Sequence, residues 1–262
     1  MVAFMSNDKD HIFGAVRDMY TDVATHPEKR FHFPTGRAAC EFVGYSAAQL
    51  DAIPATACES FAGVGYPFAA DVIRTGNTVL DIGSGSGTDA LIAASLTGPN
   101  GQVLGLDMTD AMRQKLKINA QHQGTANVEV IPGNAEEIPL PDASVHVVTS
   151  NGVLNLVPDK HKAFAEIFRV LRPGGHLQIA DIVVGKRLSD KCREDPQLWA
   201  ECIVGAVQEG DYFAIFKQVG FTNIEKLSEL DYFSGSSNEE TRRVAASFGA
   251  HTVVMRASKP AH

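Results

Sequence analysis

The sequence lacks several features that mark particular protein classes. It has no run of 18 consecutive apolar residues, so no transmembrane helix is predicted, and its first residues show no basic segment followed by an apolar core, so no secretory signal is predicted. Lys and Arg total 23 against 31 Asp and Glu, which gives a net charge of −8. Nucleic-acid binding is disfavoured because it calls for a basic surface. We therefore expect a cytoplasmic protein without nucleic-acid or membrane partners.

Cysteine is also scarce, and its spacing matches no metal or redox motif. The four cysteines are Cys40, Cys58, Cys192 and Cys202, and no two of them form a C-x-x-C pair. The sequence therefore predicts no zinc or other metal site and no thioredoxin-like motif. In a reducing cytoplasm we expect all four side chains to be free thiols.

From about residue 76 the sequence alternates between short apolar runs and segments with helical spacing. This alternation indicates a mostly parallel sheet with helices on both faces, a fold that binds ligands at the carboxyl ends of its strands. Strands are predicted over 77–83, 101–107, 127–133, 144–151, 176–184, 222–227 and 251–258. Helices are predicted over 10–24, 88–96, 109–124, 159–172 and 210–221, the fourth terminated by the Pro-Gly-Gly at 173–175.

Three regions follow from this pattern. Residues 1–70 do not alternate and are interpreted as a helical N-terminal cap over the strand ends. Residues 71–184 form the predicted Rossmann-like core. Residues 185–262 contain a segment at 185–210 that is long for a loop, which suggests a wall of a substrate pocket, and the strands that complete the sheet. The polar stretch 233–241 is predicted to be a loop.

The turn after the first core strand is rich in glycine and favours one cofactor over two others. Its sequence, TVLDIGSGSGTDA, lacks the lysine of a phosphate-binding P-loop. A dinucleotide motif needs G-x-G-x-x-G, but the spacing of Gly83, Gly85 and Gly87 brings the third glycine one position early. Asp81, at the end of the strand, suits a ligand with a cationic end. The amino group and sulfonium of S-adenosylmethionine (SAM) meet that requirement.

Two further strand ends agree with SAM. Asp107 ends the second core strand, twenty positions after Gly87, where a carboxylate meets ribose hydroxyls in this architecture. Asn134 and Ala135 follow the third strand, where a side-chain amide and a backbone N–H can meet an adenine edge. Together these landmarks predict SAM as the cofactor.

The segments VLDIGSGSG, GLDMT, GNAEEIPLPDASVHVV and RVLRPGGHLQIAD resemble the class I SAM-dependent methyltransferases. The resemblance implies a seven-stranded sheet with an antiparallel last strand and S-adenosylhomocysteine as the product. It also implies that Asp81 and Gly83 face the methionine end of SAM. The full set of cofactor-binding residues expected from the resemblance is Asp81, Gly83, Gly85, Gly87, Asp107, Met108, Asn134, Ala135 and Asn151.

Within that class, residues 76–257 resemble the arsenite methyltransferases, most tellingly in EDPQLWAECIVGAVQEGDYFAIFKQVGF. Those enzymes hold trivalent arsenic with thiolates, soft ligands for a thiophilic centre. Cys202 matches a family arsenic ligand, whereas Gly152 stands where the family has a second cysteine. Cys40 is a candidate to replace that ligand from the cap. Tyr20 corresponds to a family tyrosine near the cofactor, so Tyr20, Gly152 and Cys202 are the expected substrate-binding residues.

Three hypotheses remain open. The first is methyl transfer to a trivalent arsenical or a related soft acceptor. The second is methyl transfer to a small organic acceptor, such as a thiol, a quinol-like ring or a sterol-like lipid, with the cysteines as packing residues; the space left by Gly152 favours it. The third is a SAM-binding module without turnover.

One further position departs from the wider class. His146 stands where that class has an aspartate, and it alternates with Val145 and Val147, so its side chain points to the opposite face of the strand. We predict a hydrogen-bonded structural role for this histidine rather than proton transfer.

Overall fold

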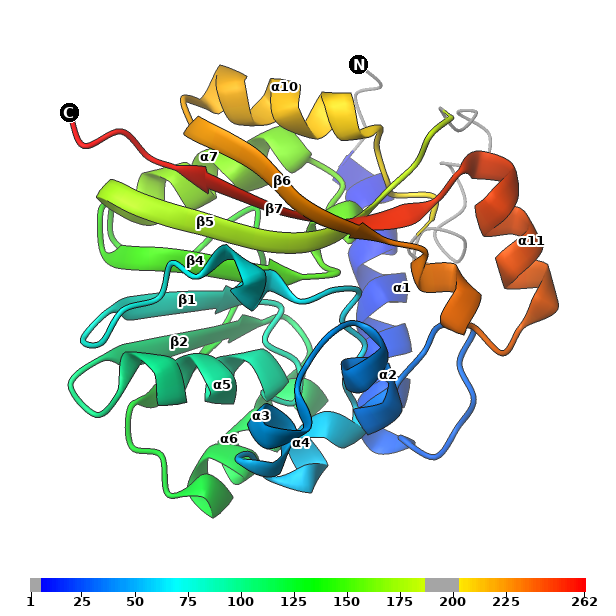
Figure 1. Ribbon diagram of the computed structural model, residues 1–262, viewed down its shortest axis with the longest axis horizontal. Coiled ribbons are helices and arrows are strands. Elements are labelled where there is room, and N and C mark those ends of the chain that lie inside the picture. Colours follow the sequence, from blue (N-terminus) through cyan, green and yellow to red (C-terminus); the bar gives the residue numbers. More distant parts are fainter. Residues whose placement is uncertain (1–5, 187–202) are drawn as a thin grey trace.

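Within residues 6–186 and 203–262, which the computed structural model describes, seven strands form one sheet in the order β3-β2-β1-β4-β5-β7-β6 (Figure 1). Pairing from β1 to β5 is parallel, whereas β7 runs antiparallel to both β5 and β6. The predicted seven-stranded, mostly parallel sheet is therefore confirmed. The strands are β1 (Thr78–Ile82), β2 (Gln102–Asp107), β3 (Val128–Pro132), β4 (Val145–Asn151), β5 (Leu171–Val183), β6 (Thr222–Leu230) and β7 (His251–Ser258).

Helices cover both faces of this sheet. One apolar core packs α5, α6 and the N-terminal helices against one face, and a second packs α7 and α10 against the other. Among the described residues, no helix combines the length and apolar character that a membrane span requires. The α-helices are α1 (Ser6–Thr25), α2 (Gly36–Phe42), α3 (Ala47–Asp51), α4 (Ala55–Glu59), α5 (Thr88–Thr97), α6 (Asp110–Gln123), α7 (Lys160–Val170), α10 (Glu209–Val219) and α11 (Glu239–Phe248), with 3₁₀ turns η1 (Pro67–Ala70), η2 (Leu154–Leu156) and η3 (Tyr232–Gly235).

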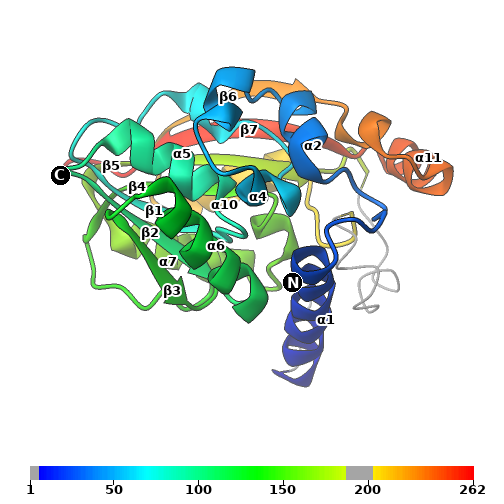
Figure 2. The same ribbon diagram turned by 90° about the horizontal axis from the view of Figure 1, so that it is seen from below.

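The N-terminal helices lie over the carboxyl ends of the strands. Figure 2 shows α1 beside α6, against which it packs. The shorter helix α4 is joined to the turn after β1, because Ser86 Oγ and Thr88 Oγ1 both donate to the carbonyl of Ala57, at 2.6 and 2.8 Å. Lys9 Nζ lies 3.2 Å from carboxylate oxygens of Glu136 and Asp159. The cap thus contacts the core through buried and half-buried polar groups.

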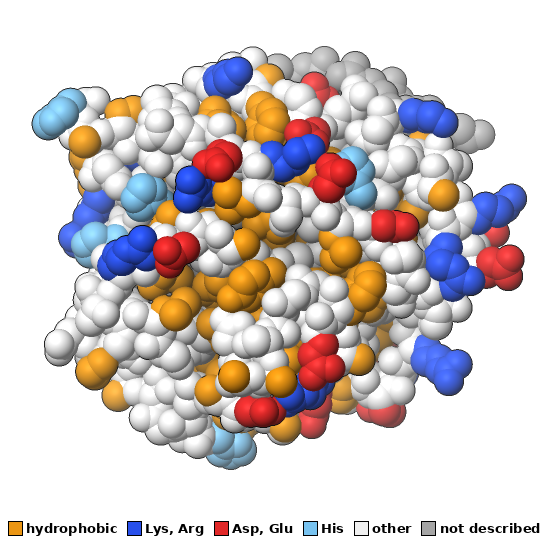
Figure 3. Space-filling view, viewed as in Figure 1, with side chains coloured by type: hydrophobic (Ala, Val, Ile, Leu, Met, Phe, Trp, Pro, Cys, Tyr) orange, Lys and Arg blue, Asp and Glu red, His pale blue; other side chains and the backbone are white. Residues whose placement is uncertain are grey.

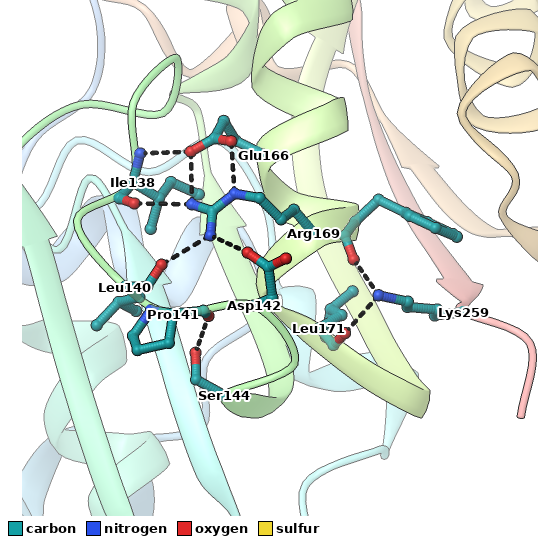
Figure 4. Close-up of polar contacts among 10 residues, drawn as sticks. Ile138, Leu140, Pro141, Asp142, Ser144, Glu166, Arg169, Leu171 and Lys259 are labelled. Atoms are coloured by element: carbon teal, nitrogen blue, oxygen red, sulfur yellow. Dashed lines mark hydrogen bonds and ion pairs between the residues drawn. The ribbon is translucent and has the colours of Figure 1, made fainter.

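The helix before β5 ends earlier than predicted. The sequence suggested a helix terminated by the Pro-Gly-Gly at 173–175, but α7 ends at Val170 and β5 already includes residues 171–175. A residue that precedes proline is disfavoured in the helical region, so Arg172 before Pro173 favours an extended chain. Lys259 Nζ donates to the carbonyls of Phe168 and Leu171, at 2.7 Å each, and so caps this helix end (Figure 4).

The prediction of a loop over 233–241 is also wrong for most of that stretch. Residues 232–235 form the 3₁₀ turn η3, and α11 begins at Glu239. Asn238 caps α11, its side chain accepting from the N–H groups of Glu240 and Thr241. Ser, Gly and Asn are typical of loops, but Asn followed by two Glu is also a helix start.

Arg169 on α7 fixes the loop between β3 and β4 (Figure 4). Its guanidinium donates to the carbonyls of Ile138 and Leu140, at 2.9 and 2.8 Å, and pairs with Glu166 and Asp142, at 2.7 and 2.8 Å. Glu166 in turn accepts from the N–H of Ile138. The hydrogen bond to Arg169 holds the pKa of Glu166 below its usual range. This network positions the loop that follows β3.

Candidate functional site

A pocket opens at the carboxyl ends of β1 to β4, beneath the N-terminal helices. It encloses about 950 Å³, counting space open to solvent. Because parallel strands end at one edge of the sheet, the residues after each strand meet here. Of the expected cofactor and substrate residues, those that line the pocket are Tyr20, Asp81, Gly83, Gly85, Asp107, Met108, Asn134, Ala135, Asn151 and Gly152.

The turn after β1 needs glycine for steric reasons. Gly83 and Gly85 have φ of +70° and +53°, in the left-handed region that disfavours side chains. A Cβ on Gly83 would lie 2.3 Å from Val153 Cγ2. The N–H of Gly83 donates to the carbonyl of Leu106 at 2.7 Å, which ties the turn to the neighbouring strand. The pocket floor is therefore backbone, which lets a ligand approach closely.

Gly87 stands between Ser86 and Thr88, which both line the pocket. Gly87 does not line the pocket. It is the residue before α5, with φ of +106°, and a Cβ there would lie 2.5 Å from Leu116 Cδ1. A side chain at this position would therefore collide with α6, and the expected contact of Gly87 with the cofactor stays a prediction.

Asp81 is buried at the end of β1 with one carboxylate oxygen unmatched. Its side chain lines the pocket, and Oδ2 has no hydrogen-bond partner among the described residues. Burial, followed by the charges of Asp89 and Asp107, raises the pKa of Asp81 well above its usual value. Ser84 Oγ, on the turn itself, is a second unmatched buried polar atom in the lining. Such atoms fit a ligand that brings a cationic hydrogen-bond donor, as the amino group of SAM does.

Asp107 ends β2 and joins the two neighbouring turns. Its Oδ2 accepts from the N–H of Gly85 at 2.9 Å, and its Oδ1 from the N–H of Thr109 at 2.8 Å. Burial raises the pKa of this carboxyl, and the two hydrogen bonds oppose the rise. An oriented carboxylate at this strand end is placed to accept from ribose hydroxyls.

Asn151 lines the pocket, but its amide is used by the cap. Its Oδ1 accepts from the N–H groups of Val64 and Gly65, at 2.8 and 3.1 Å, and its Nδ2 lies 3.0 Å from Tyr45 Oη and from Asp89 Oδ2. Tyr45 also donates to Asp89. Asn151 therefore orders the cap over the strand ends as well as facing the pocket.

Sequence reasoning missed Asp89, which accepts hydrogen bonds from both Tyr45 and Asn151 and so completes this contact between cap and core. Burial raises the pKa of Asp89 to about 6, against the hydrogen bonds from Tyr45 and Asn151. The chain did carry one signal, since an acidic residue in the first turn of a helix is stabilised by the helix dipole. The other missed lining residues are mainly apolar: Phe13, Val16, Phe61, Ile82, Leu106, Met112, Val153, Leu156 and Val157.

The structure does not bring Cys40 into the pocket. Cys40 is buried in the cap beside Cys58, and neither lines the pocket. The hydrogen bond with Cys58 and burial raise the pKa of the Cys40 thiol, which disfavours the thiolate that binds soft metals. This packing lends no support to Cys40 as an acceptor ligand, and that role stays a prediction. Cys202 lies outside the described residues.

Gly152 and Tyr20 both line the pocket. Gly152 has φ of +71°, and a Cβ there would lie 3.1 Å from Val64 Cγ1 and 3.6 Å from the carbonyl of Ala62. Tyr20 stacks on Phe33, with ring centroids 6.2 Å apart. Gly152 is thus enclosed on the cap side by an apolar side chain and a backbone carbonyl.

Asn134 and Ala135 follow β3, at the wall that the Arg169 network supports. Both line the pocket. Asn134 Oδ1 accepts from the N–H of Glu136 at 2.8 Å. This contact fixes the turn whose edge was expected to meet adenine. His146 lies at the other end of β4, where its Nδ1 accepts from the N–H of Thr78 at 2.9 Å, so the predicted hydrogen bond is confirmed.

Comparison with known proteins agrees with this site. A family model described as a methyltransferase domain matches residues 73–220. An arsenite methyltransferase of Halobacterium salinarum is 38% identical over 191 residues, which cover 73% of this chain and 49% of that protein. A ubiquinone/menaquinone biosynthesis C-methyltransferase of a Marinomonas species is 38% identical over 110 residues, covering 42% of this chain and 44% of that protein.

One solved structure is similar over most of the chain. The crystal structure of CrArsM, an arsenic(III) S-adenosylmethionine methyltransferase from Chlamydomonas reinhardtii, superposes with a TM-score of 0.64 at 30% identity and covers 87% of this chain and 74% of that one. The chain spans about half the length of the curated arsenite methyltransferases that it matches.

Proposed function

This chain belongs to the class I SAM-dependent methyltransferases and is close to the arsenite methyltransferases; from that premise we propose that it transfers the methyl group of SAM to a small acceptor, a trivalent arsenical first of all. The observation that carries the proposal is the buried carboxylate of Asp81, with an unmatched oxygen, at the head of a glycine turn. Such a group suits the cationic end of SAM and no phosphate ligand.

In this proposal the strand ends divide the cofactor between them. Asp81 binds the amino group, Asp107 the ribose hydroxyls, and the turn at Asn134 and Ala135 the adenine edge. SAM supplies an electrophilic methyl group on a sulfonium. The apolar residues of the lining, such as Leu156, keep water from that methyl group and hold the acceptor in line with it.

For an arsenical acceptor, the arsenic lone pair forms the bond to carbon while the carbon–sulfur bond of the sulfonium breaks and leaves S-adenosylhomocysteine. The chain's part is to present trivalent arsenic with soft ligands, and Cys202 is the residue proposed for this. With Cys40 in the cap core, a small thiol from solution would supply the remaining sulfur. The arsenite methyltransferases of other organisms support this choice of acceptor.

A small organic acceptor is the second candidate. Within residues 6–186 and 203–262 no cysteine lines the pocket, and the surroundings of Gly152 are Val64 and Ala62. The apolar part of the pocket lining, which includes Leu156 and Val157, suits a ring better than a metalloid. The similarity to a C-methyltransferase of quinone biosynthesis supports the same alternative.

The proposal assigns a part to each region of the chain. Residues 1–70 act as the cap over the pocket, residues 71–184 hold the cofactor, and residues 185–262 supply the acceptor wall and complete the sheet. A cytoplasmic location, expected from the sequence, is part of the same proposal.

The deciding experiment measures release of S-adenosylhomocysteine with SAM and excess small thiol, adding arsenite, methylarsenite, or members of a panel of thiols and quinols. Arsenical turnover that collapses in Cys202→Ser and persists in Cys192→Ser supports the first candidate. Turnover of an organic acceptor that is equal in both variants selects the second. Calorimetric SAM binding without turnover of any acceptor contradicts both and leaves a binding module.

A further inference from the structure

A second cavity lies at the opposite edge of the sheet, where the parallel strands begin. It measures about 1180 Å³ on the same basis as the first. Residues before β1, at the start of β4 and β5, and around the β6–β7 pair line it. The charged and imidazole side chains in its wall are Asp71, Arg74, His146, Arg172, His176, Glu225 and Arg256.

The three arginines of this wall differ in their acidic partners. Arg256 is committed to Glu225, with Nε and Nη2 at 3.0 and 2.7 Å from one carboxylate oxygen. Arg74 meets the exposed Asp71 through Nη1 alone, at 3.1 Å. Arg172 is exposed and has no acidic partner within residues 6–186 and 203–262. Arg172 and part of Arg74 are therefore free to bind an anion.

The contact of Arg172 with His146 leaves two donors face to face. Arg172 Nη1 lies 2.9 Å from His146 Nε2. The other ring nitrogen, Nδ1, accepts from the N–H of Thr78. A neutral imidazole has one acceptor nitrogen and one N–H, so Nε2 carries the hydrogen. Guanidinium and imidazole N–H groups thus converge without an acceptor between them.

The second histidine belongs to the same wall. His176 Nδ1 lies 3.1 Å from Ser258 Oγ. Burial, followed by the charges of Arg256 and Arg74, lowers the pKa of His176, so both guanidiniums act on this ring. In Figure 3, histidine and Lys/Arg side chains gather beside acidic ones at the left of the molecule, where β4 and β5 begin in Figure 1.

We propose that this cavity binds an oxyanion of the phosphate type, free or as a monoester, with Arg172 Nη1 and His146 Nε2 donating to one of its oxygens. An oxygen placed between the two donors resolves their conflict, and Arg172 is exposed enough to turn toward it. Arg74, which also lines the cavity, supplies a third donor through its unmatched guanidinium nitrogens. The planar guanidinium is suited to a tetrahedral oxyanion.

The balance of charge fits this class of ligand. Three arginines face two carboxylates, so the wall is positive with both imidazoles neutral, although the whole chain carries −8. The cavity is larger than a single ion needs, which leaves room for the organic part of a monoester. A long polyanion is disfavoured by the negative remainder of the surface.

This site is separate from the methyl-transfer pocket. His146 is the second residue of β4, near the amino edge of the sheet, and Asn151 is the last, at the carboxyl edge. The five residue steps between them span about 17 Å of extended chain. The two cavities share no lining residue. Binding at the second cavity can therefore be measured with the first one empty.

The test is calorimetric titration of the chain with inorganic phosphate, sulfate and glycerol 3-phosphate, against chloride at equal ionic strength. We expect saturable binding of the oxyanions and a shift of the His146 ring signals in NMR spectra. Arg172→Ala should weaken binding about tenfold, the loss expected for one charge-assisted hydrogen bond. Tighter binding of glycerol 3-phosphate than of phosphate would identify a monoester as the ligand, and equal binding the free ion.

Two more variants make the result decisive. His146→Asp places a carboxylate opposite Arg172 while keeping an acceptor for the N–H of Thr78, so it should abolish oxyanion binding without unfolding the chain. Arg243→Ala removes an exposed arginine of α11 that pairs with Glu240 and should change nothing. No saturation above chloride in the wild type, or equal losses in Arg172→Ala and Arg243→Ala, would overturn the proposal.

Discussion

The two edges of one sheet present opposite environments. At the carboxyl edge, Asp81, Asp89 and Asp107 are buried under the cap, and burial raises the pKa of each. At the amino edge, Arg74 and Arg172 remain exposed. Because the same five parallel strands serve both edges, the difference comes from what covers them. The cap buries carboxyl groups at the carboxyl edge, and a cationic ligand brings the positive charge that favours their ionised form.

The largest effect on this contrast between the two edges is expected from Asp81→Asn. We expect the dissociation constant for SAM to rise several hundredfold or more, because the ligand's cation then loses its buried partner, a loss of about 3–5 kcal/mol. Calorimetric titration with SAM measures it, and Asp71→Asn at the amino edge is the matched control. Unchanged binding in Asp81→Asn would remove this residue from the site.

A second prediction uses the pKa of Asp89, raised by burial from 3.8 to about 6. The folded state holds this proton more tightly than the unfolded state, so its contribution to stability is present below pH 4 and is lost as pH rises through 6. Between pH 4 and 7 the ligand-free wild type should lose about 3 kcal/mol more unfolding free energy than Asp89→Asn. Urea unfolding at several pH values measures both slopes, and equal slopes would contradict the assignment.

The glycine turn allows a comparison at constant backbone strain. Gly83 and Gly124 share a φ of +70°. A Cβ on Gly83 would lie 2.3 Å from Val153 Cγ2, whereas a Cβ on Gly124 would have no heavy atom within 4 Å among the described residues. Both alanine variants lose about 1 kcal/mol for the backbone. Gly83→Ala should lose about 2 kcal/mol more and weaken SAM binding, as thermal unfolding and titration will show. Equal losses would mean that the turn relaxes freely.

The smallest expected effect concerns the loop that follows β3. Arg169→Ala removes hydrogen bonds to the carbonyls of Ile138 and Leu140 and pairs with Glu166 and Asp142. We expect a severalfold increase in the dissociation constant for SAM, because the wall at Asn134 loosens without losing a ligand contact. Arg243→Ala, which also breaks an arginine–glutamate pair, controls for charge.

The sequence predicted what local patterns determine and missed what the cap brings in. The strands, the glycine turn and Asp81 and Asp107 follow from periodicity and turn chemistry. Asp89 escaped because its importance depends on Tyr45, which is 44 positions away and contacts it only after the cap has docked. Cys40 was predicted to face the pocket because no pattern in the sequence indicates that it packs against Cys58.

The position of β7 also bears on how the chain folds. β7 pairs with β5 on one side and β6 on the other, so β6 cannot join the sheet until residues 251–258 have been synthesised. Until then β5 has an unpaired edge, and such edges are sites of aggregation. A nascent chain that stalls before residue 251 would therefore depend on chaperones to shield that edge, whereas the parallel pairs β3-β2-β1-β4 could already have formed.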